Sequence, residues 1–163
     1  MSLSRNRLGI VSILIATAAL VVSGLSTYSS LTALQVNKKA ARAQLFSNFQ
    51  QQYAGVASQF PSKLSDPNWR PERDSEDWWK LKRYWDLCYV EWYATQRLHP
   101  ELYGPLWDTF YSHVIGDALD YRSLRGVLVD LMQLQQRDKA PDKNDFYDFL
   151  RARAKEKGLS LQP

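Results

Sequence analysis

His113 and Asp117 are the residues whose types and spacing come closest to a reactive pair in this chain. They are four positions apart, so both side chains would lie on one face of a helix, and Asp108 is close to them in sequence. A metal site needs three or more converging ligands with supporting contacts, and one histidine–aspartate pair does not meet that requirement. We therefore interpret His113 as a structural histidine and predict no catalytic residue, metal ion or cofactor.

The only cysteine, Cys88, is expected in a hydrophobic core. It falls on the apolar face of a predicted helix, and no histidine lies near it in sequence. A thiol buried in apolar surroundings is inert, which disfavours a nucleophilic role. Phosphate-binding glycine loops, paired zinc cysteines and nucleophile elbows are also missing from the sequence. An enzyme that uses His113 and Asp117 therefore stays open only as a lesser alternative.

An uncharged stretch near the N-terminus predicts a single-pass transmembrane helix. Residues 8–36 contain no charged side chain and no histidine, and residues 8–25 are almost entirely apolar or small. Residues 8–25 would cover roughly 27 Å as a helix, enough for the hydrocarbon core of a bilayer. The alternative is a cleaved signal peptide, with Arg5 and Arg7 ahead of the hydrophobic residues 9–22. The helical pattern continues beyond Ser26, so we expect a retained span.

The orientation of that span is weakly determined. Arg5 and Arg7 precede it, and Lys38, Lys39 and Arg42 follow it, so the positive charges on its two sides nearly balance. A lone cysteine allows no intramolecular disulfide, which fits a reducing compartment. We therefore expect the C-terminal domain on the cytoplasmic side.

Small residues recur along the predicted span with a period of seven residues and would form one stripe on a helix. Helices in lipid associate through close backbone approach, which small side chains permit. We interpret the stripe as a surface that packs against a second copy or the span of another protein. Its positions are Gly9, Ser12, Ala16, Ala19, Ser23, Ser26 and Ser30.

The rest of the chain is expected to be all-α, with no alternating strand pattern. We predict an N-terminal tail and span over 1–36, a juxtamembrane helix over 37–60, a linker over 61–73 and a compact helical domain over 74–163.

The charge of the chain after residue 37 is nearly balanced. This part holds 19 of the chain's 21 lysine and arginine residues and all 17 acidic residues, so its net charge is only +2. Such a balanced charge disfavours a role in nucleic-acid binding.

Caps and apolar spacing predict four helices in the domain. The first starts at Asp74 or Ser75 and ends at His99-Pro100, the next runs from Gly104-Pro105 to Leu119, the third from Asp120 or Ser123 to Leu134, and the last from Asp142 or Asn144 to Gly158. The expected inward residues of the first helix are Trp78, Leu81, Trp85, Cys88 and Trp92. Those of the second are Leu106, Phe110, Val114 and Ala118.

Aromatic residues are concentrated in this domain. Thirteen of the chain's 21 lie between Trp69 and Tyr121, including all six tryptophans. Trp79, Tyr89 and Tyr93 fall off the main apolar stripe, and exposed aromatic side chains gather at protein interfaces and membrane surfaces. We expect these three residues, with Lys38, Lys39 and Arg42, to contact a partner or the bilayer.

The segments Tyr84-Trp85-Asp86-Leu87-Cys88 and Glu91-Trp92-Tyr93 resemble uncharacterised families of small bacterial single-pass membrane proteins with a Trp-rich helical domain. That resemblance implies a topology and no chemistry. The sequence favours a membrane-anchored helical interaction protein, an accessory subunit or scaffold of a membrane complex. The alternative is a helical sensor or signalling module, which would require a pocket lined by converging polar groups.

Overall fold

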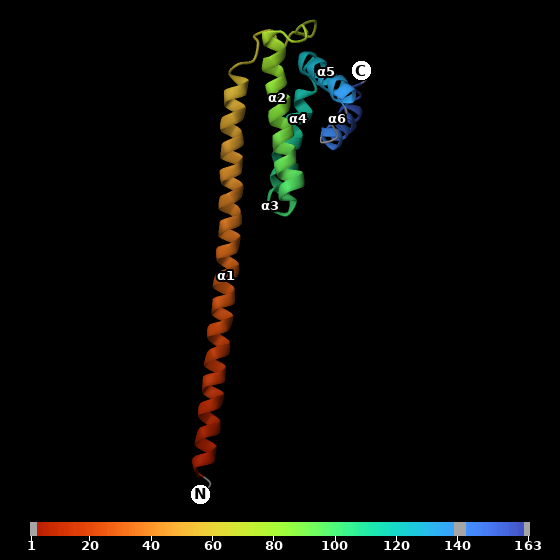
Figure 1. Ribbon diagram of the computed structural model, residues 1–163. Helices are drawn as coiled ribbons and strands as arrows, with labels where there is room; N and C mark the ends of the chain where they lie inside the picture. The colour runs from red at the N-terminus through yellow and green to blue at the C-terminus, as the bar shows by residue number, and fades with distance from the viewer. Residues whose placement is uncertain (1–2, 139–142, 162–163) are drawn as a thin grey trace. The chain divides into compact units, whose positions relative to one another are not determined.

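The computed structural model describes the backbone of residues 3–138 and 143–161, and the side chains of residues 23–136 and 143–161. Within those ranges all regular structure is helical, which confirms the all-α class and the helical bundle (Figure 1). The elements are α1 (Leu3–Ala57), α2 (Glu76–Tyr93), the π-helical segment η1 (Ala94–Leu98), α3 (Pro100–Leu106), the π-helical segment η2 (Trp107–Tyr111), α4 (Ser112–Ala118), α5 (Arg122–Asp138) and α6 (Asn144–Glu156).

The chain divides into two compact units, Met1–Ala43 and Gln44–Pro163. The first consists of the N-terminal part of α1. The second holds residues 44–57 of α1 together with all later helices, and Phe49 of α1 is buried in its core. The candidate site described below lies entirely within the second unit.

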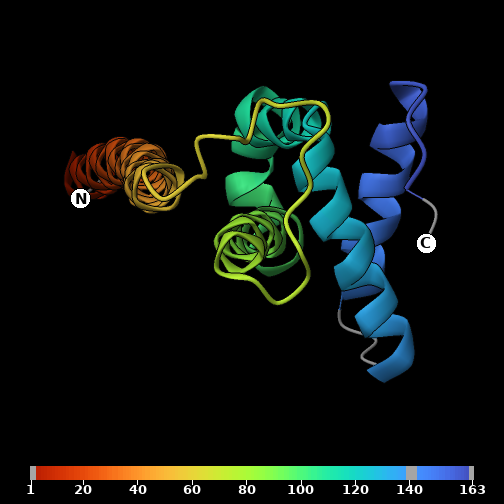
Figure 2. The same cartoon turned by 90° about the horizontal axis from the view of Figure 1, so that it is seen from above.

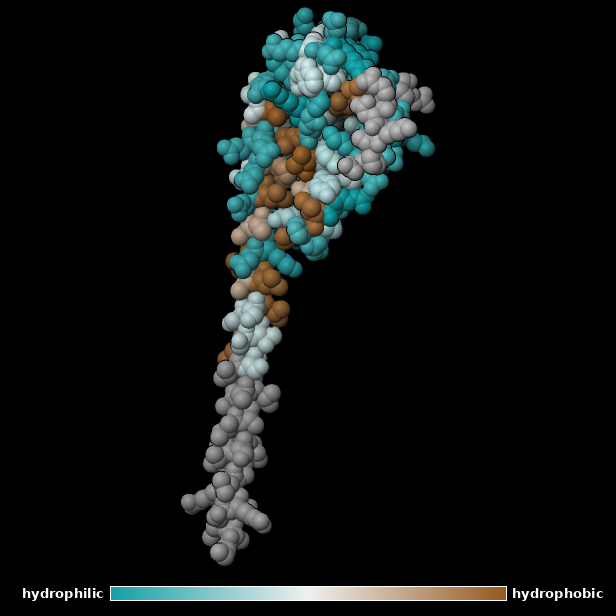
Figure 3. Space-filling model, viewed as in Figure 1, coloured by the Kyte–Doolittle hydropathy of each residue, from teal (hydrophilic) through white to brown (hydrophobic). Residues whose placement is uncertain are grey.

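The prediction of a transmembrane helix is contradicted. Among the residues described, none of the helices combines the length and the apolarity that crossing a membrane requires. From Ser23 onward the apolar side chains of α1 alternate with hydroxyl, amide and lysine side chains, and Figure 3 shows pale and teal residues among the brown ones there. The side chains of residues 8–22 lie outside those described, and the stripe positions Gly9, Ser12, Ala16 and Ala19 fall among them. The predicted membrane localisation is therefore withdrawn.

Helix α2 begins and ends where its sequence signals predict. The hydroxyl oxygen of Ser75 accepts a hydrogen bond from the backbone N–H of Trp78 at 3.2 Å, which is the bond of an N-cap. Glu76 and Asp77 in the first turn place negative charge at the positive end of the helix dipole. The helical path continues through η1 and stops at His99, directly before Pro100.

The predicted inward face of α2 is confirmed, because all five of its residues are buried. Two of them, Trp78 and Trp85, also bond to α5, which lies beside α2 (Figure 2). The indole N–H of Trp78 donates to Asp130 Oδ2 at 3.0 Å, and the indole N–H of Trp85 donates to the backbone carbonyl of Leu124 at 2.9 Å. The second carboxylate oxygen of Asp130 accepts from the Arg70 guanidinium at 2.6 Å.

The helical region after Pro100 differs from its prediction in both start and register. It starts at Pro100, so Gly104 and Pro105 lie inside α3 instead of before the helix. Trp107 and Tyr111 of η2 are buried, whereas the predicted inward residues Phe110 and Val114 are only half-buried. The buried positions Trp107, Tyr111 and Ile115 thus lie one residue after the predicted Leu106, Phe110 and Val114.

The last two helices follow their predicted positions closely. Helix α5 starts at Arg122, between the two predicted caps, and its backbone continues to Asp138. Helix α6 starts at Asn144 and ends before Gly158, whose φ of +69° gives the left-handed turn that glycine favours. The predicted cap Asp142 lies outside the described residues. Phe149 packs edge-on against Trp107, with ring centroids 5.1 Å apart.

Trp85 is buried in the core, whereas Trp79 on the same helix is partly exposed, so their replacement should affect stability differently. Trp85→Ala should lower the free energy of unfolding by about 3–5 kcal/mol, because it leaves a large cavity in the core. Trp79→Ala removes a side chain that is 48% exposed and should change stability by less than about 1 kcal/mol. Chemical denaturation of both full-length variants measures the difference. Equal losses would mean that Trp79 also belongs to the core.

Candidate functional site

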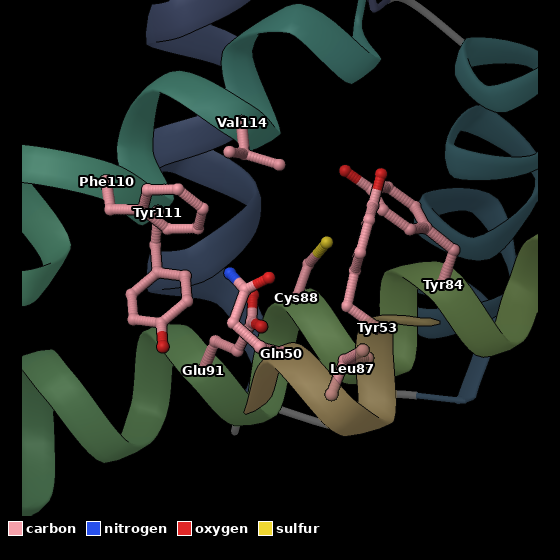
Figure 4. A pocket seen from close by; sticks show the side chains of 9 residues that line it. All are labelled: Gln50, Tyr53, Tyr84, Leu87, Cys88, Glu91, Phe110, Tyr111 and Val114. Atoms are coloured by element: carbon pink, nitrogen blue, oxygen red, sulfur yellow. The ribbon is translucent and has the colours of Figure 1, made fainter. Parts of the chain in front are cut away.

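A cavity of about 120 Å³ lies inside the second unit. It is enclosed by three segments that are distant in sequence: the end of α1, the middle of α2, and η2 with the start of α4 (Figure 4). We call it the Glu91 cavity. Its lining residues are Gln50, Tyr53, Tyr84, Leu87, Cys88, Glu91, Phe110, Tyr111 and Val114.

Helical spacing places four of the lining residues on one face of α2. Tyr84, Leu87, Cys88 and Glu91 follow the i, i+3, i+4, i+7 pattern, so they line up along the helix. This face is adjacent to the tryptophan face, because residues 84 and 85 are separated by about 100° around the helix axis. One side of α2 therefore binds α5, and the neighbouring side forms a wall of the cavity.

Glu91 is an acidic residue that is buried at the wall of the cavity. Its side chain is 6% exposed, and within the described part of the chain no residue donates a hydrogen bond to its carboxylate or pairs with it. Burial away from water raises its pKa from 4.5 to about 8. The side chain is therefore mostly a neutral carboxylic acid at pH 7, lying against the cavity.

Tyr84 and Cys88 interact with each other beside Glu91. The hydroxyl of Tyr84 hydrogen-bonds to the thiol, and burial, followed by the neighbouring Cys88, raises the pKa of Tyr84 well above its usual value. Burial likewise raises the pKa of Cys88 well above its usual value, with a further contribution from Glu91. The thiol stays protonated at neutral pH, which agrees with the expectation of a buried, inert cysteine.

Tyr111 contributes a polar group without a partner. Its hydroxyl is buried and has no hydrogen-bond partner among the described residues. Its pKa is raised mainly by burial and further by Glu91, which places the two groups within electrostatic range of each other. Buried polar groups are nearly always paired in folded proteins.

The reactive pair considered from the sequence does not come together in this cavity. His113 is exposed and does not line it. Asp117 is exposed as well, and its carboxylate lies 3.5 Å from the ammonium group of Lys157. Within residues 3–138 and 143–161, no group of three or more histidine, cysteine, aspartate or glutamate side chains is placed to hold a metal ion.

The residues predicted to contact a partner lie in different surroundings. Trp79 and Tyr93 are 48% and 42% exposed, whereas Tyr89 is half-buried, with its ring edge-on to Phe146. Lys38 and Lys39 are exposed on α1, and Arg42 is half-buried. Their role in a contact stays a prediction.

The stripe positions whose side chains are described, Ser23, Ser26 and Ser30, are exposed on α1. The Ser30 hydroxyl donates to the backbone carbonyl of Ser26 at 2.8 Å, so it is bonded within its own helix. Thr27 donates to the Ser23 carbonyl in the same way, at 2.9 Å. Helix packing along this stripe also stays a prediction.

Sequence reasoning missed Gln50, Tyr53, Glu91 and Tyr111 as site residues. For Glu91 a signal was present, because it lies three residues after Cys88 on a face that is otherwise apolar or aromatic. An acid on the buried face of an amphipathic helix is rare and therefore informative. Gln50, Tyr53 and Tyr111 carry no such signal, since only the tertiary packing brings them to the same cavity.

Comparison of the chain with models of protein families, with curated proteins and with solved structures finds no match. The resemblance of residues 84–93 to small single-pass proteins therefore stays an expectation. The site has to be interpreted from its own geometry, that is, from a buried acid, an unpaired hydroxyl and the aromatic walls around them.

The raised pKa of Glu91 predicts how stability depends on pH. The unfolded chain loses this proton near pH 4.5 and the folded chain only near pH 8. Stability is therefore greatest below pH 4.5, decreases as the pH rises to about 8, and is constant above that value. Glu91→Gln cannot ionise, so at pH 8.5 it should be more stable than the wild type by a few kcal/mol, on the order of 1–4.

Thermal unfolding of both proteins between pH 5 and pH 9 tests this expectation. The melting temperatures should approach each other near pH 5 and separate as the pH rises. Glu76→Gln on the same helix is a suitable control, because Glu76 is exposed and bonded to Lys80. Parallel pH profiles for the wild type and Glu91→Gln would contradict the assignment of a buried, neutral Glu91.

Proposed function

We propose that this protein is a helical sensor module that binds a small molecule in the Glu91 cavity. The observation that carries the proposal is the buried carboxyl group of Glu91, which bonds to no described residue and lines the cavity. Polar groups of Gln50, Tyr53 and Tyr111 lie around the same space, together with apolar walls from α2, η2 and α4. Small-molecule sites typically combine mostly apolar walls with a few converging polar groups.

The energetics of Glu91 support a functional role. Burying an acid without a partner destabilises a fold, and an apolar side chain of similar size would avoid that cost. Strongly shifted pKa values in cavities occur preferentially at functional sites. Tyr111 adds a second unfavourable feature, the unpaired hydroxyl, to the same surroundings. A buried acid that lines a cavity and bonds to no described residue is more simply explained by a bound molecule than by packing.

The arrangement of the walls suggests how binding could be sensed. A ligand would contact α1 through Gln50 and Tyr53, α2 through Glu91, and η2 through Tyr111. A ligand stabilises the arrangement of elements that it contacts, and so shifts the protein towards that arrangement. Segment η2 is π-helical, and π-turns within helices are frequently found at functional sites.

The size of the cavity limits the ligand. A buried apolar cavity of about 150 Å³ holds benzene, so the Glu91 cavity, at about 120 Å³, suits a molecule of similar or smaller size. A molecule held entirely within this volume is smaller than a nucleotide, a peptide or a lipid. The ligand expected here has on the order of six non-hydrogen atoms or fewer.

Filling the cavity should abolish binding. Val114→Phe places an aromatic ring where the ligand would lie, since Val114 lines the cavity from α4. Benzene and isopropanol serve as neutral probes, and at ten times its dissociation constant a probe should raise the melting temperature of the wild type by about 4 °C. Val90→Phe is the matched control, because Val90 is 49% exposed on the outside of α2.

The expected result is stabilisation of the wild type and of Val90→Phe, and none of Val114→Phe. Two-dimensional NMR spectra of the three proteins would locate the affected residues. If the probes stabilise Val114→Phe as much as the wild type, or shift no resonance of the lining residues, the cavity is not the binding site.

A second candidate function is the binding of another protein through α2. Trp79, Val90 and Tyr93 are all more than two-fifths exposed and lie on one side of the helix, at spacings of eleven and three residues. Exposed aromatic side chains of this kind are enriched in the central contacts of protein interfaces. This candidate retains the interaction role favoured by the sequence.

The two candidate functions depend on different residues. A double substitution of Trp79 and Tyr93 by alanine should leave the fold and the binding of small probes intact, while it weakens co-purification of a partner by tenfold or more. The cavity-filling Val114→Phe variant should retain the partner. Quantitative co-purification from cells that express each variant at equal levels measures both. Loss of the partner from neither variant would remove this candidate.

A further inference from the structure

We propose that the Glu91 cavity is selective for a small alkylammonium cation, which the Glu91 carboxylate and the surrounding aromatic rings bind together. The inference rests on the proposed function, because it assumes that the cavity is a ligand site, and it adds the chemical class of the ligand. Three features of the cavity support it: the sign of its charge, the kind of side chains in its walls, and the behaviour of Glu91 as a titrating group.

The charge of the cavity favours a cation. Among its nine lining residues, Glu91 is the one carboxylic acid, and none is lysine, arginine or histidine. The other titratable groups that face Glu91 are Tyr53 from α1, Tyr84 and Cys88 from α2, and Tyr111 from η2. Burial raises the pKa of each, so all four are neutral when Glu91 ionises. An anion in this cavity would therefore find no opposite charge.

The walls are suited to a cation as well. Four of the nine lining residues are aromatic, and Figure 4 shows Tyr53 and Tyr84 on one side of Glu91 and Gln50, with Phe110 and Tyr111 on the other. Aromatic faces attract cations, most strongly in desolvated sites, and sets of aromatic residues are used to recognise alkylated ammonium groups. The Gln50 amide offers a further polar contact.

The proton of Glu91 gives the binding reaction a defined stoichiometry. At pH 7 the cavity holds a neutral carboxylic acid, because its pKa is about 8. An ammonium cation favours the carboxylate, so one proton leaves Glu91 for solvent as one cation enters. The ammonium group keeps its own proton over this range, as lysine does with a pKa of about 10.4. Net charge in the cavity is zero both before and after binding.

A neutral ligand of the same shape would behave differently. It would accept a hydrogen bond from the protonated Glu91 and release no proton, so its affinity would not increase with pH. It would also leave the acid without an advantage over glutamine, which offers both a donor and an acceptor at a similar size. Isopropylammonium and isopropanol differ mainly in charge and therefore make a suitable pair of probes.

Isothermal titration calorimetry of the full-length protein with each probe at pH 6.5, 7.5 and 8.5 tests the proposal. The association constant for isopropylammonium should rise about tenfold from pH 6.5 to pH 7.5 and level off above pH 8, because one proton is released per cation bound. At pH 8.5 isopropanol should bind at least tenfold more weakly, and its affinity should not rise with pH. Titrations in two buffers of different ionisation enthalpy should show the released proton directly.

The variants separate the role of Glu91 from that of the cavity. Glu91→Gln should lose isopropylammonium binding by tenfold or more and lose its pH dependence, while isopropanol binding persists. Glu76→Gln should match the wild type with both probes. Should Glu91→Gln fail to fold, the pH dependence and proton release of the wild type decide the question without it.

The possible failures are distinguishable. If isopropanol binds as tightly as isopropylammonium, or if no proton is released, the cation proposal is wrong and the small-molecule site stands. If neither probe binds the wild type at any of the three pH values, both the cation proposal and the proposed function are overturned.

Discussion

A tryptophan side chain can be buried at low cost only if its indole N–H reaches an acceptor. In this protein two indoles of α2 meet that requirement on α5: Trp78 bonds to the Asp130 carboxylate, and Trp85 bonds to the carbonyl of Leu124. These bonds fix the rotation of α2 about its axis. Once the tryptophans point to α5, helical geometry turns Tyr84, Cys88 and Glu91 about a quarter turn away, towards α1 and η2. The set of α2 residues that line the cavity therefore follows from the hydrogen bonds of the two indole N–H groups to α5.

Asp130 and Glu91 show two outcomes for a buried acid in the same bundle. Asp130 receives the indole N–H of Trp78 and the guanidinium of Arg70, so both of its oxygens are bonded. Glu91 is buried to the same degree, yet no described residue bonds to its carboxylate, and burial raises its pKa to about 8. The bonded carboxylate of Asp130 stabilises the fold, whereas the buried carboxyl group of Glu91 destabilises it. That contrast within a single core is the strongest reason to assign Glu91 a role outside stability.

Much of the fold could be predicted because its signals are local. The start of α2 is set by the Ser75 cap, its end by Pro100, and its buried face by the spacing of Trp78, Trp85 and Trp92. The face of α3 to α4 was predicted one residue out of register, since apolar residues occur at helical spacing on two neighbouring faces of this region. The membrane span was predicted from the uncharged run at residues 8–36, but no helix among the described residues is long and apolar enough to cross a membrane. The cavity needed three distant segments at once, which periodicity within one helix cannot supply.

The walls of the cavity are also the contacts that hold the end of α1 in the second unit. Phe49 packs edge-on against Tyr111 at 5.7 Å, and Tyr53 packs against Tyr84 at 6.2 Å. Tyr53, Tyr84 and Tyr111 line the Glu91 cavity as well. Any molecule that binds there must therefore change the free energy of packing between residues 44–57 and the rest of the unit. Because such linkage is reciprocal, anything that loosens or tightens this packing must alter the affinity of the cavity by the same factor. A sensor needs that coupling, and here the shared aromatic side chains provide it.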